Sequence, residues 1–260
     1  MFPVSDFAPV RGREGVGRVT YWIGRVDPSM WWQGAWWQEV VPADVRLAIL
    51  SLGVQRLTDD ELERAHQMIL ERVAMLDREG VDVINVGGSP VVGVHGREGH
   101  DRLLADIGRL TSRPYVTALQ AELEAIEILG GRRIAMAAPY PVRQTEKRVA
   151  ALADYGVDVV GYRTMDIERN RFIAELDPAD VLDFVLQVAE ENPTADLLYA
   201  PCGAFPVTRV IQEIERRSGL SVVTNVQAQA AACLRRIDYP QPVSGFGRLL
   251  DMVGDVAAQV

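Results

Sequence analysis

The sequence predicts an α/β protein made of two similar lobes, each with a doubly wound parallel sheet. Short apolar runs rich in β-branched residues alternate with longer amphipathic runs, as in sheets whose strands are buried on both faces. The 260 residues suffice for one large domain or for two small ones that share an interface. Segments of the first half also recur in the second half, in the same order.

The expected strands and helices alternate along the chain. The strand candidates are residues 17–23, 81–86, 114–119, 133–138, 157–161, 196–200 and 220–225. The helix candidates are residues 59–79, 98–111, 120–129, 143–155, 178–191, 207–218 and 227–236. Thr58 and Glu61 have the spacing of a capping box that opens the first helix. Asp177 followed by Pro178 predicts the start of the helix at 178.

Three pairs of matching segments indicate a duplicated unit, the alternative being a chance likeness between α/β segments. GVGRVTYWIG resembles GGRRIAMAAP (133 − 18 = 115), VDVINVGGSP resembles DLLYAPCGAF (202 − 87 = 115), and YVTALQAE resembles VVTNVQAQ (227 − 120 = 107). A duplication predicts two halves that face each other across a pseudo-twofold axis. Ligands bind at the carboxyl ends of strands in open α/β sheets. Gly87 and Cys202 would then flank one cleft from opposite sides.

The predicted division of the chain follows these matches. Residues 1–118 and part of the C-terminal segment form an N-terminal lobe, and residues 119–225 form a C-terminal lobe. Residues 226–260 are expected to form a helix and tail that pack back on the N-terminal lobe.

Composition excludes several classes of function. The net charge of −9 argues against binding nucleic acid through a basic face. No apolar run approaches the roughly 18 residues of a membrane-spanning helix, and MFPVSDFAPVRGREG lacks the pattern of a signal peptide. Two cysteines suit a reducing compartment, so a cytoplasmic location is expected. The three histidines form no ligand pattern and Lys147 is the single lysine, so we expect no metal and no cofactor.

Cys202 is the first candidate site residue, because it follows a predicted strand and precedes a helix. Backbone N–H groups at such a junction bind anions, and the helix dipole stabilises a thiolate there. Gly203 allows close backbone approach. The alternative is a small buried residue without chemistry, and the two interpretations weigh equally on spacing alone.

The corresponding junction of the first half is GGS at residues 87–89, which supplies backbone N–H groups and one hydroxyl. It is neither a dinucleotide fingerprint nor a P-loop, and a simple turn is the alternative. Tyr140 ends a third predicted strand, so its hydroxyl could reach the same cleft; otherwise it is a partly buried aromatic residue.

Four segments together resemble the arylmalonate decarboxylase and maleate isomerase branch of the aspartate/glutamate racemase superfamily. They are INVGGSPVV, AMAAPYPVRQTEKRV, LLYAPCGAFPVTRVIQEIERRSGLSVV and GFGRLLD, and the resemblance covers roughly residues 60–251. It implies two α/β lobes with the active site in the cleft between them. Racemases and maleate isomerases carry one cysteine from each lobe, whereas arylmalonate decarboxylase keeps the second and has glycine at the first. This sequence looks like the latter, with Gly87 and Cys202.

The resemblance also implies roles for individual residues. Cys202 matches the catalytic cysteine, and the matches to substrate-binding positions are Gly87, Gly88, Ser89, Tyr140, Gly203 and Ala204. Gly88 stands where the family has a threonine, and Ala204 stands where it has a glycine, so the charged end of the substrate could be held differently.

The expected function is that of a cofactor-independent, decarboxylase-like lyase acting on a substituted malonate-type or related small carboxylic acid. Its enediolate would be stabilised by hydrogen-bond donors, its CO₂ would leave into an apolar pocket, and Cys202 would protonate one face. One alternative is a cis–trans isomerase or racemase of a small dicarboxylate or amino acid, with Cys202 as nucleophile or base. Another is a carboxylate-binding protein without turnover. The expected partner is a small carboxylate, and assembly into a homo-oligomer stays open.

Residues 22–37 contain all five tryptophans, so a substrate-side lid or aromatic wall and a subunit contact are alternative predictions. His95 and His100 follow the GGS junction, where they would be proton donors or, more often, solvated loop residues. Cys233 is expected in the core of a helix.

Two arginines, Arg25 and Arg143, are candidate carboxylate clamps, with ordinary surface arginines as the alternative.

Overall fold

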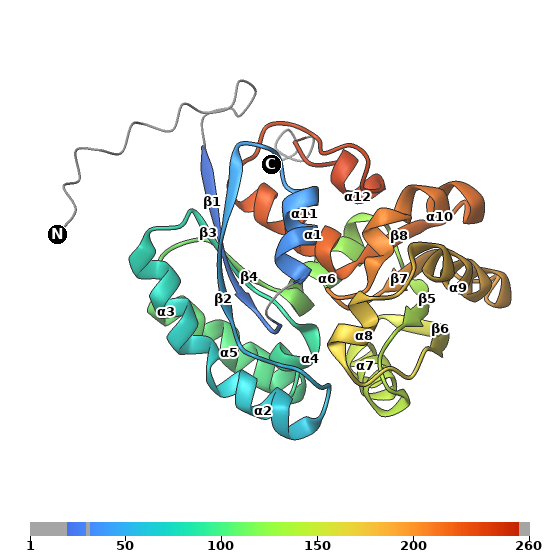
Figure 1. Ribbon diagram of the computed structural model, residues 1–260, viewed down its shortest axis with the longest axis horizontal. Helices are drawn as coiled ribbons and strands as arrows, with labels where there is room; N and C mark the ends of the chain where they lie inside the picture. The colour runs from blue at the N-terminus through green and yellow to red at the C-terminus, as the bar shows by residue number, and fades with distance from the viewer. Residues whose placement is uncertain (1–19, 30–31, 255–260) are drawn as a thin grey trace.

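The computed structural model describes residues 20–29 and 32–254, and it contains two parallel four-stranded sheets (Figure 1). The strand order is β2-β1-β3-β4 in the N-terminal lobe and β6-β5-β7-β8 in the C-terminal lobe, so the two lobes have the same topology. Every strand pair is parallel. The predicted α/β class and its two similar lobes are confirmed.

The elements of the N-terminal lobe come first in the chain. Its strands are β1 (Tyr21–Asp27), β2 (Val45–Ser51), β3 (Val83–Val86) and β4 (Tyr115–Thr117). Its helices are α1 (Trp32–Val40), α2 (Asp59–Gln67), α3 (Ile69–Glu79), α4 (Ser89–Val92) and α5 (Gly96–Leu110). The linking helix α6 (Ala118–Ile128) follows β4.

The C-terminal lobe repeats the arrangement. Its strands are β5 (Arg133–Ala138), β6 (Asp158–Thr164), β7 (Leu197–Ala200) and β8 (Ser221–Thr224). Its helices are α7 (Val142–Asp154), α8 (Asn170–Ala174), α9 (Pro178–Glu191), the 3₁₀ turn η2 (Pro206–Arg209) and α10 (Ile211–Ser218). Helices α11 (Asn225–Arg236) and α12 (Arg248–Asp251) follow.

The central strands are apolar because helices cover them. Strands β3 and β7 are buried along their whole length. In the N-terminal lobe, α3 packs on β1 and β3, and α11 packs on β3 and β4 (Figure 1). In the C-terminal lobe, α9 packs on β5, β6 and β7. A strand that is covered on both faces has a continuous apolar sequence. These strands are therefore predictable from the sequence.

Two helix starts show that the two lobes match in structure at β4 and β8. The hydroxyl of Thr117 accepts a hydrogen bond from the Gln120 N–H, and that of Thr224 accepts one from the Gln227 N–H. The second of these is a full capping box. Each threonine ends the last strand of its sheet, so the offset of 107 between the halves is structural.

The predicted offset of 115 is wrong for the first strand of each lobe. Ile23 of β1 pairs with Val83 of β3, and Ile134 of β5 pairs with Leu197 of β7, which gives an offset of 111 (134 − 23 = 111). Accordingly, β1 runs to Asp27, four residues past the predicted end, because these residues pair with β2 and β3. The start of the predicted strand, residues 17–19, lies outside the described residues.

Some local predictions also need correction. Strand β2 is absent from the predicted strands although its sequence, VRLAILS, is largely apolar; it is an edge strand whose residues are mostly half-buried. The helix predicted over residues 59–79 is two helices that meet at Met68. Thr58 makes no capping bond; the Glu61 carboxylate instead accepts the N–H groups of Gln55 and Arg56. The predicted start at Asp177 is confirmed, since its carboxylate accepts the Ala179 N–H.

Helix α11 packs against α6, α1 and β4. Arg236 at its end donates to the Tyr115 carbonyl and pairs with Glu124. Beyond it, the Tyr239 hydroxyl donates to Asp44. These contacts tie the C-terminal segment to the N-terminal lobe, while the exact lobe boundaries stay a prediction.

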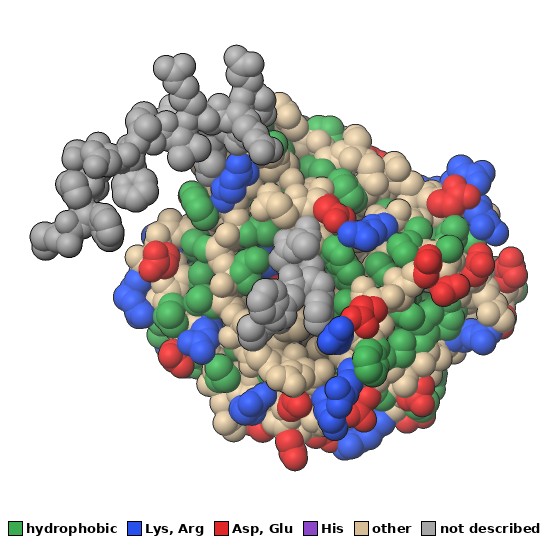
Figure 2. All heavy atoms as spheres, viewed as in Figure 1, with side chains coloured by type: hydrophobic (Ala, Val, Ile, Leu, Met, Phe, Trp, Pro, Cys, Tyr) green, Lys and Arg blue, Asp and Glu red, His purple; other side chains and the backbone are tan. Residues whose placement is uncertain are grey.

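The surface is mixed in charge. On the face in Figure 2, basic and acidic side chains of the described residues are interspersed rather than gathered by sign. None of the described helices is both long enough and apolar enough to cross a membrane.

Candidate active site

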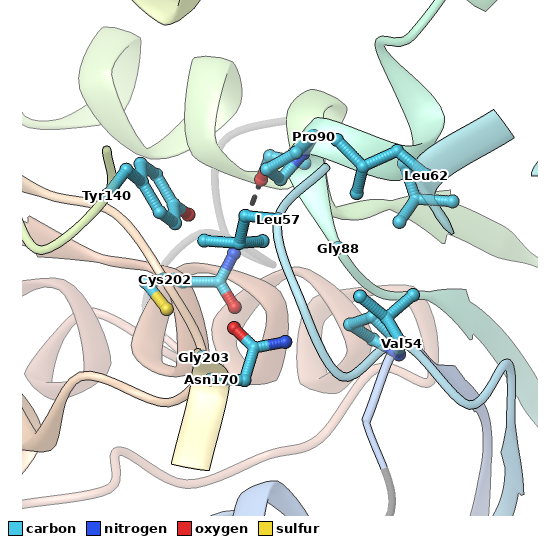
Figure 3. A pocket seen from close by; sticks show the side chains of 13 residues that line it. Val54, Leu57, Leu62, Gly88, Pro90, Tyr140, Asn170, Cys202 and Gly203 are labelled. Atoms are coloured by element: carbon cyan, nitrogen blue, oxygen red, sulfur yellow. Dashed lines mark hydrogen bonds between the residues drawn. The ribbon is translucent and has the colours of Figure 1, made fainter. Parts of the chain in front are cut away.

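The site lies where each sheet reverses its winding direction. In both lobes this switch point falls between the first and third strands, that is between β1 and β3 and between β5 and β7. The residues just past these strand ends are Pro28 and Gly88 in one lobe and Tyr140 and Cys202 in the other. All four line a single pocket, and Figure 3 shows Gly88, Tyr140 and Cys202 around it. The topology therefore brings the predicted junctions together.

Cys202 is held in an unusual backbone conformation, with a φ of 93° that non-glycine residues rarely adopt. The residue is 7% exposed. Burial raises the pKa of the thiol to about 12, and hydrogen bonds from the Ala204 backbone, the Tyr140 hydroxyl and the Phe205 backbone only partly oppose this effect. Cys202 is therefore a neutral thiol at physiological pH. The strained backbone is consistent with a residue held for function.

Tyr140 is also buried, and burial raises the pKa of its phenol well above 10.0. Its hydroxyl is thus a hydrogen-bond donor at any physiological pH. The backbone of Tyr140 is fixed by two hydroxyls, because its carbonyl accepts hydrogen bonds from Thr145 and Thr164.

Gly88, and not Gly87, occupies the position that corresponds to Cys202. Val86 pairs with Thr117 and Ala200 pairs with Thr224, so the residue two places past each strand is Gly88 or Cys202 (202 − 88 = 114). The backbone agrees, since Gly88 has a φ of 84°. A Cβ at Gly88 would lie 2.9 Å from Cγ of Pro28. No side chain fits opposite Cys202 unless Pro28 moves.

The other predicted site residues have distinct surroundings. Gly203 lines the pocket, whereas Gly87 and Ala204 are not among its lining residues. The Gly87 N–H is used in the sheet, donating to the Val26 carbonyl at 2.7 Å. Among the hydrogen bonds of the described residues, none uses the N–H of Gly88, Ser89 or Gly203 as its donor. These three groups are available to an anion.

Ser89 lines the pocket and belongs to a buried polar cluster, called here the Glu122 cluster. Its members are Ser89, Glu122, Arg148, Tyr199 and Asn225. None is more than 6% exposed. Its centre is the Glu122 carboxylate, which pairs with Arg148. The cluster joins α4, α6, α7, β7 and α11, so it spans both lobes behind the pocket.

The remaining wall combines one free amide with apolar side chains. Asn170, at the start of α8, is 5% exposed, and its side-chain amide hydrogen-bonds to none of the described residues. Figure 3 shows this amide in the pocket near Cys202, with Leu57, Leu62 and Val54 also lining it. Asn170 is therefore free to bond a ligand, while the aliphatic side chains offer an apolar surface.

Several predicted candidates lie elsewhere. His95 is exposed beside Glu63. His100 is buried between Tyr155 and Thr117, and burial lowers its pKa to about 4. Neither histidine lines the pocket, so the prediction of proton donors near the cleft is not supported.

The arginine clamps are also committed to other partners. Arg25 is fully buried, where it pairs with Asp27 at 2.9 Å, and Arg143 pairs with Asp59 at the surface. Cys233 is in the core, as predicted.

Two of the tryptophans, Trp36 and Trp37, belong to the core rather than to the described lining of this pocket. Trp36 and Trp37 are buried, and the Arg25 guanidinium lies 3.6 Å from the centroid of the Trp37 ring. Neither tryptophan lines the pocket. Trp22 is 45% exposed. Trp31 and the side chain of Trp32 lie outside the described part of the chain.

Within residues 20–29 and 32–254, no group of three His, Cys, Asp or Glu side chains could hold a metal ion.

The sequence analysis did not predict Asn170 or four members of the Glu122 cluster, namely Glu122, Arg148, Tyr199 and Asn225. A signal existed for Glu122, because it falls on the helical stripe shared by Leu119 and Ile126, where an apolar residue is expected. Asn225 also directly follows a strand end. Asn170 gave no signal, since its neighbours are polar and it reaches the pocket only through the tertiary fold.

Comparisons with known proteins agree with this geometry. A family profile described as arylmalonate decarboxylase matches residues 38–250. Arylmalonate decarboxylase from Bordetella bronchiseptica is 25% identical over 209 residues, covering 80% of this chain and 87% of that protein. Maleate isomerase from Pseudomonas putida is 31% identical over 137 residues, covering 53% of this chain and 54% of that protein.

Solved structures share the fold. A glycine-to-cysteine, cysteine-to-serine double mutant of arylmalonate decarboxylase in its liganded form gives a TM-score of 0.83 at 24% identity, covering 89% of this chain and 99% of that chain. A cysteine-to-serine mutant of Nocardia farcinica maleate cis-trans isomerase with a covalently bound succinylcysteine intermediate gives 0.80 at 21% identity, covering 89% and 98%.

Proposed function

The chain belongs to the arylmalonate decarboxylase family, and from that premise we propose that it is a cofactor-independent lyase that decarboxylates a small malonate-type acid. Its relatives are an arylmalonate decarboxylase and maleate isomerases, which supports either a decarboxylase or an isomerase activity. One observation favours the decarboxylase. The pocket holds a single neutral thiol, Cys202, and the corresponding position of the other lobe is Gly88, where a Cβ has no room.

In the proposed reaction, one carboxylate of the substrate binds the free N–H groups of Gly88, Ser89 and Gly203 and the hydroxyl of Tyr140. The other carboxylate faces the aliphatic part of the wall. Poor solvation of that carboxylate favours the neutral product CO₂.

The bond between the α-carbon and the departing carboxylate breaks, and its electron pair moves into the bound carboxylate to give an enediolate. Donors aimed at the enediolate oxygens stabilise the developing charge, and one such donor is typically worth on the order of 3 kcal/mol. Cys202 then transfers its thiol proton to the α-carbon. The resulting thiolate regains a proton from water. A thiol that stays protonated at neutral pH suits this role as a general acid.

One observation keeps an isomerase as the second candidate. The free Asn170 amide supplies another polar contact, which would suit the second carboxylate of a dicarboxylate. Nucleophilic addition by Cys202 would need a thiolate, and a thiol pKa of about 12 disfavours that form.

A substrate panel tests the proposal: methylmalonate, phenylmalonate and maleate with the unsubstituted protein and with Cys202→Ala. The expected result is CO₂ release from a malonate, lost in Cys202→Ala, with one deuterium entering the α-carbon in D₂O. Conversion of maleate to fumarate without CO₂ release would identify an isomerase. Thermal stabilisation by these acids without turnover would identify a carboxylate-binding protein.

A further inference from the structure

The hydrogen bonds of the Glu122 cluster have a fixed direction. A carboxylate only accepts hydrogen bonds, so every polar group around Glu122 must donate to it. Ser89 Oγ lies 2.7 Å and the Tyr199 hydroxyl 2.9 Å from Oε2, and Asn225 Nδ2 lies 2.7 Å from Oε1. Arg148 bonds Oε2 as well and balances the buried charge. The Ser89 hydroxyl proton therefore points at Glu122 and away from the pocket.

The groups beside Ser89 are also fully used. Ser89 Oγ accepts a bond from Asn225 Nδ2 at 3.3 Å, and Asn225 Oδ1 accepts one from Gln229 at 2.6 Å. Asn225 thus donates to Glu122 and Ser89 and accepts from Gln229. Although both Ser89 and Asn225 line the pocket, neither side chain offers a free donor to a ligand.

We propose that Glu122 is a positioning residue of this site. Its carboxylate fixes Ser89 and Asn225 and keeps the Ser89 hydroxyl away from the substrate, so that substrate oxygens meet main-chain N–H groups instead. This inference rests on the proposed function, because it names which groups of the same site bind the substrate carboxylate. It differs from the expectation drawn from the sequence, in which the Ser89 hydroxyl itself was a donor.

Glu122 also affects the thiol across the pocket. The titratable or charged groups around Cys202 are the Tyr140 phenol and, in the cluster behind it, Glu122, Tyr199 and Arg148. The negative charge of Glu122 adds to burial in raising the pKa of Cys202. Substitutions of Glu122 can separate the effect of its charge on the Cys202 thiol from the effect of its length on the positions of Ser89 and Asn225.

Two substitutions make this separation. Glu122→Asp keeps the charge but is one methylene shorter, so it cannot hold Ser89 and Asn225 in the same places. Glu122→Gln keeps the length and removes the charge. The matched controls are Glu215→Asp and Glu215→Gln, because Glu215 is a buried carboxylate that binds the N–H groups of Val222 and Arg248 away from the pocket.

The readout is alkylation of Cys202 by iodoacetamide, followed by mass spectrometry, with and without malonate as a protecting probe. Glu122→Asp should weaken malonate protection and lower kcat/KM, each at least about tenfold, while its alkylation rate without malonate stays near that of the unsubstituted protein. Glu122→Gln should raise the alkylation rate at pH 8 at least about threefold, because more thiolate forms. The Glu215 variants should change neither quantity. If Glu122→Gln does not fold, the double variant Glu122→Gln/Arg148→Met, which removes both charges, is used to measure kcat/KM and malonate protection.

A third substitution tests the direction of the serine hydroxyl. Ser89→Ala should lower kcat/KM by less than about tenfold, because the main-chain N–H stays in place. A loss of about 10²–10³ would show that the hydroxyl binds the enediolate and would overturn the inference. Equal malonate protection in Glu122→Asp and the unsubstituted protein would overturn it too. Lack of protection in the unsubstituted protein would instead count against the proposed function, so the two failures are distinguishable.

Discussion

Gly88→Ala should destabilise the protein more than any ordinary glycine substitution at a positive φ. An alanine there meets two costs: a left-handed backbone, worth about 1–2 kcal/mol, and a Cβ placed 2.9 Å from Cγ and 3.1 Å from Cβ of Pro28. The proline ring cannot swing aside, so this second cost is that of overpacking, about 1–3 kcal/mol. The sum is about 2–5 kcal/mol.

Gly53→Ala is the matched control. Gly53 has a φ of 72°, and a Cβ there would have no atom within 4 Å, so only the backbone cost applies. The unfolded chain loses the same freedom in both variants, and this contribution cancels. The difference between the two variants therefore isolates the contact with Pro28.

The assay is urea unfolding followed by circular dichroism, and Gly88→Ala should be less stable than Gly53→Ala by about 1–3 kcal/mol. In a chain of this size the difference corresponds to roughly 2–4 °C in Tm for each kcal/mol. Equal stability of the two variants would show that the position opposite Cys202 has room for a side chain, contrary to the predicted contact with Pro28. One-sided protonation by Cys202 would then have no steric basis.

Two further predictions concern the site and its surroundings. Cys202→Gly and Cys202→Ala should both lose at least about 10²-fold in turnover. Of the two variants, Cys202→Gly should be the more stable by about 1 kcal/mol, because glycine accepts the φ of 93°. Equal free energies of unfolding in urea would show that the backbone at this position is not strained. His100 should make the protein acid-sensitive: burial lowers its pKa from 6.5 to about 4, so unfolding takes up a proton between these values. About 3 kcal/mol of stability, fully present above pH 6.5, should be lost as the pH falls to 4. Urea unfolding at pH 7 and pH 4.5 should show a smaller loss in His100→Gln, and an identical loss would contradict this role.

Much of the fold was predictable because its signals are local. The residues of β5 and α9 lie where the sequence placed them, since a short apolar run and a capped amphipathic run need no tertiary information. Strand β2 (VRLAILS) was not predicted although it is largely apolar, whereas the edge strand β6, which is just as exposed, was predicted. The break at Met68 was missed because both flanking helices present the same apolar face and no glycine or proline marks the boundary.

The residues of the site also fall into those that the sequence predicts and those that only the structure reveals. Cys202 and Tyr140 could be found because they follow buried strands, where parallel sheets place their ligands. Asn170 could not be found, because it comes from a short helix after the edge strand β6 and enters the pocket only through the path of its loop. The equivalence of Gly88 and Cys202 also required the structure, since an offset taken from letters alone was one residue out.

Two α/β lobes and a cleft with one cysteine are predictable from the sequence alone, because apolar strand runs, helix capping and the similar junctions are patterns of neighbouring residues. What that cysteine faces depends on tertiary contacts. Its burial keeps the thiol protonated, Pro28 leaves no room for a side chain at Gly88, and the charge of Glu122 turns the Ser89 hydroxyl away from the pocket. Each of these depends on atoms from distant segments being within a few ångströms of one another, which no local pattern records.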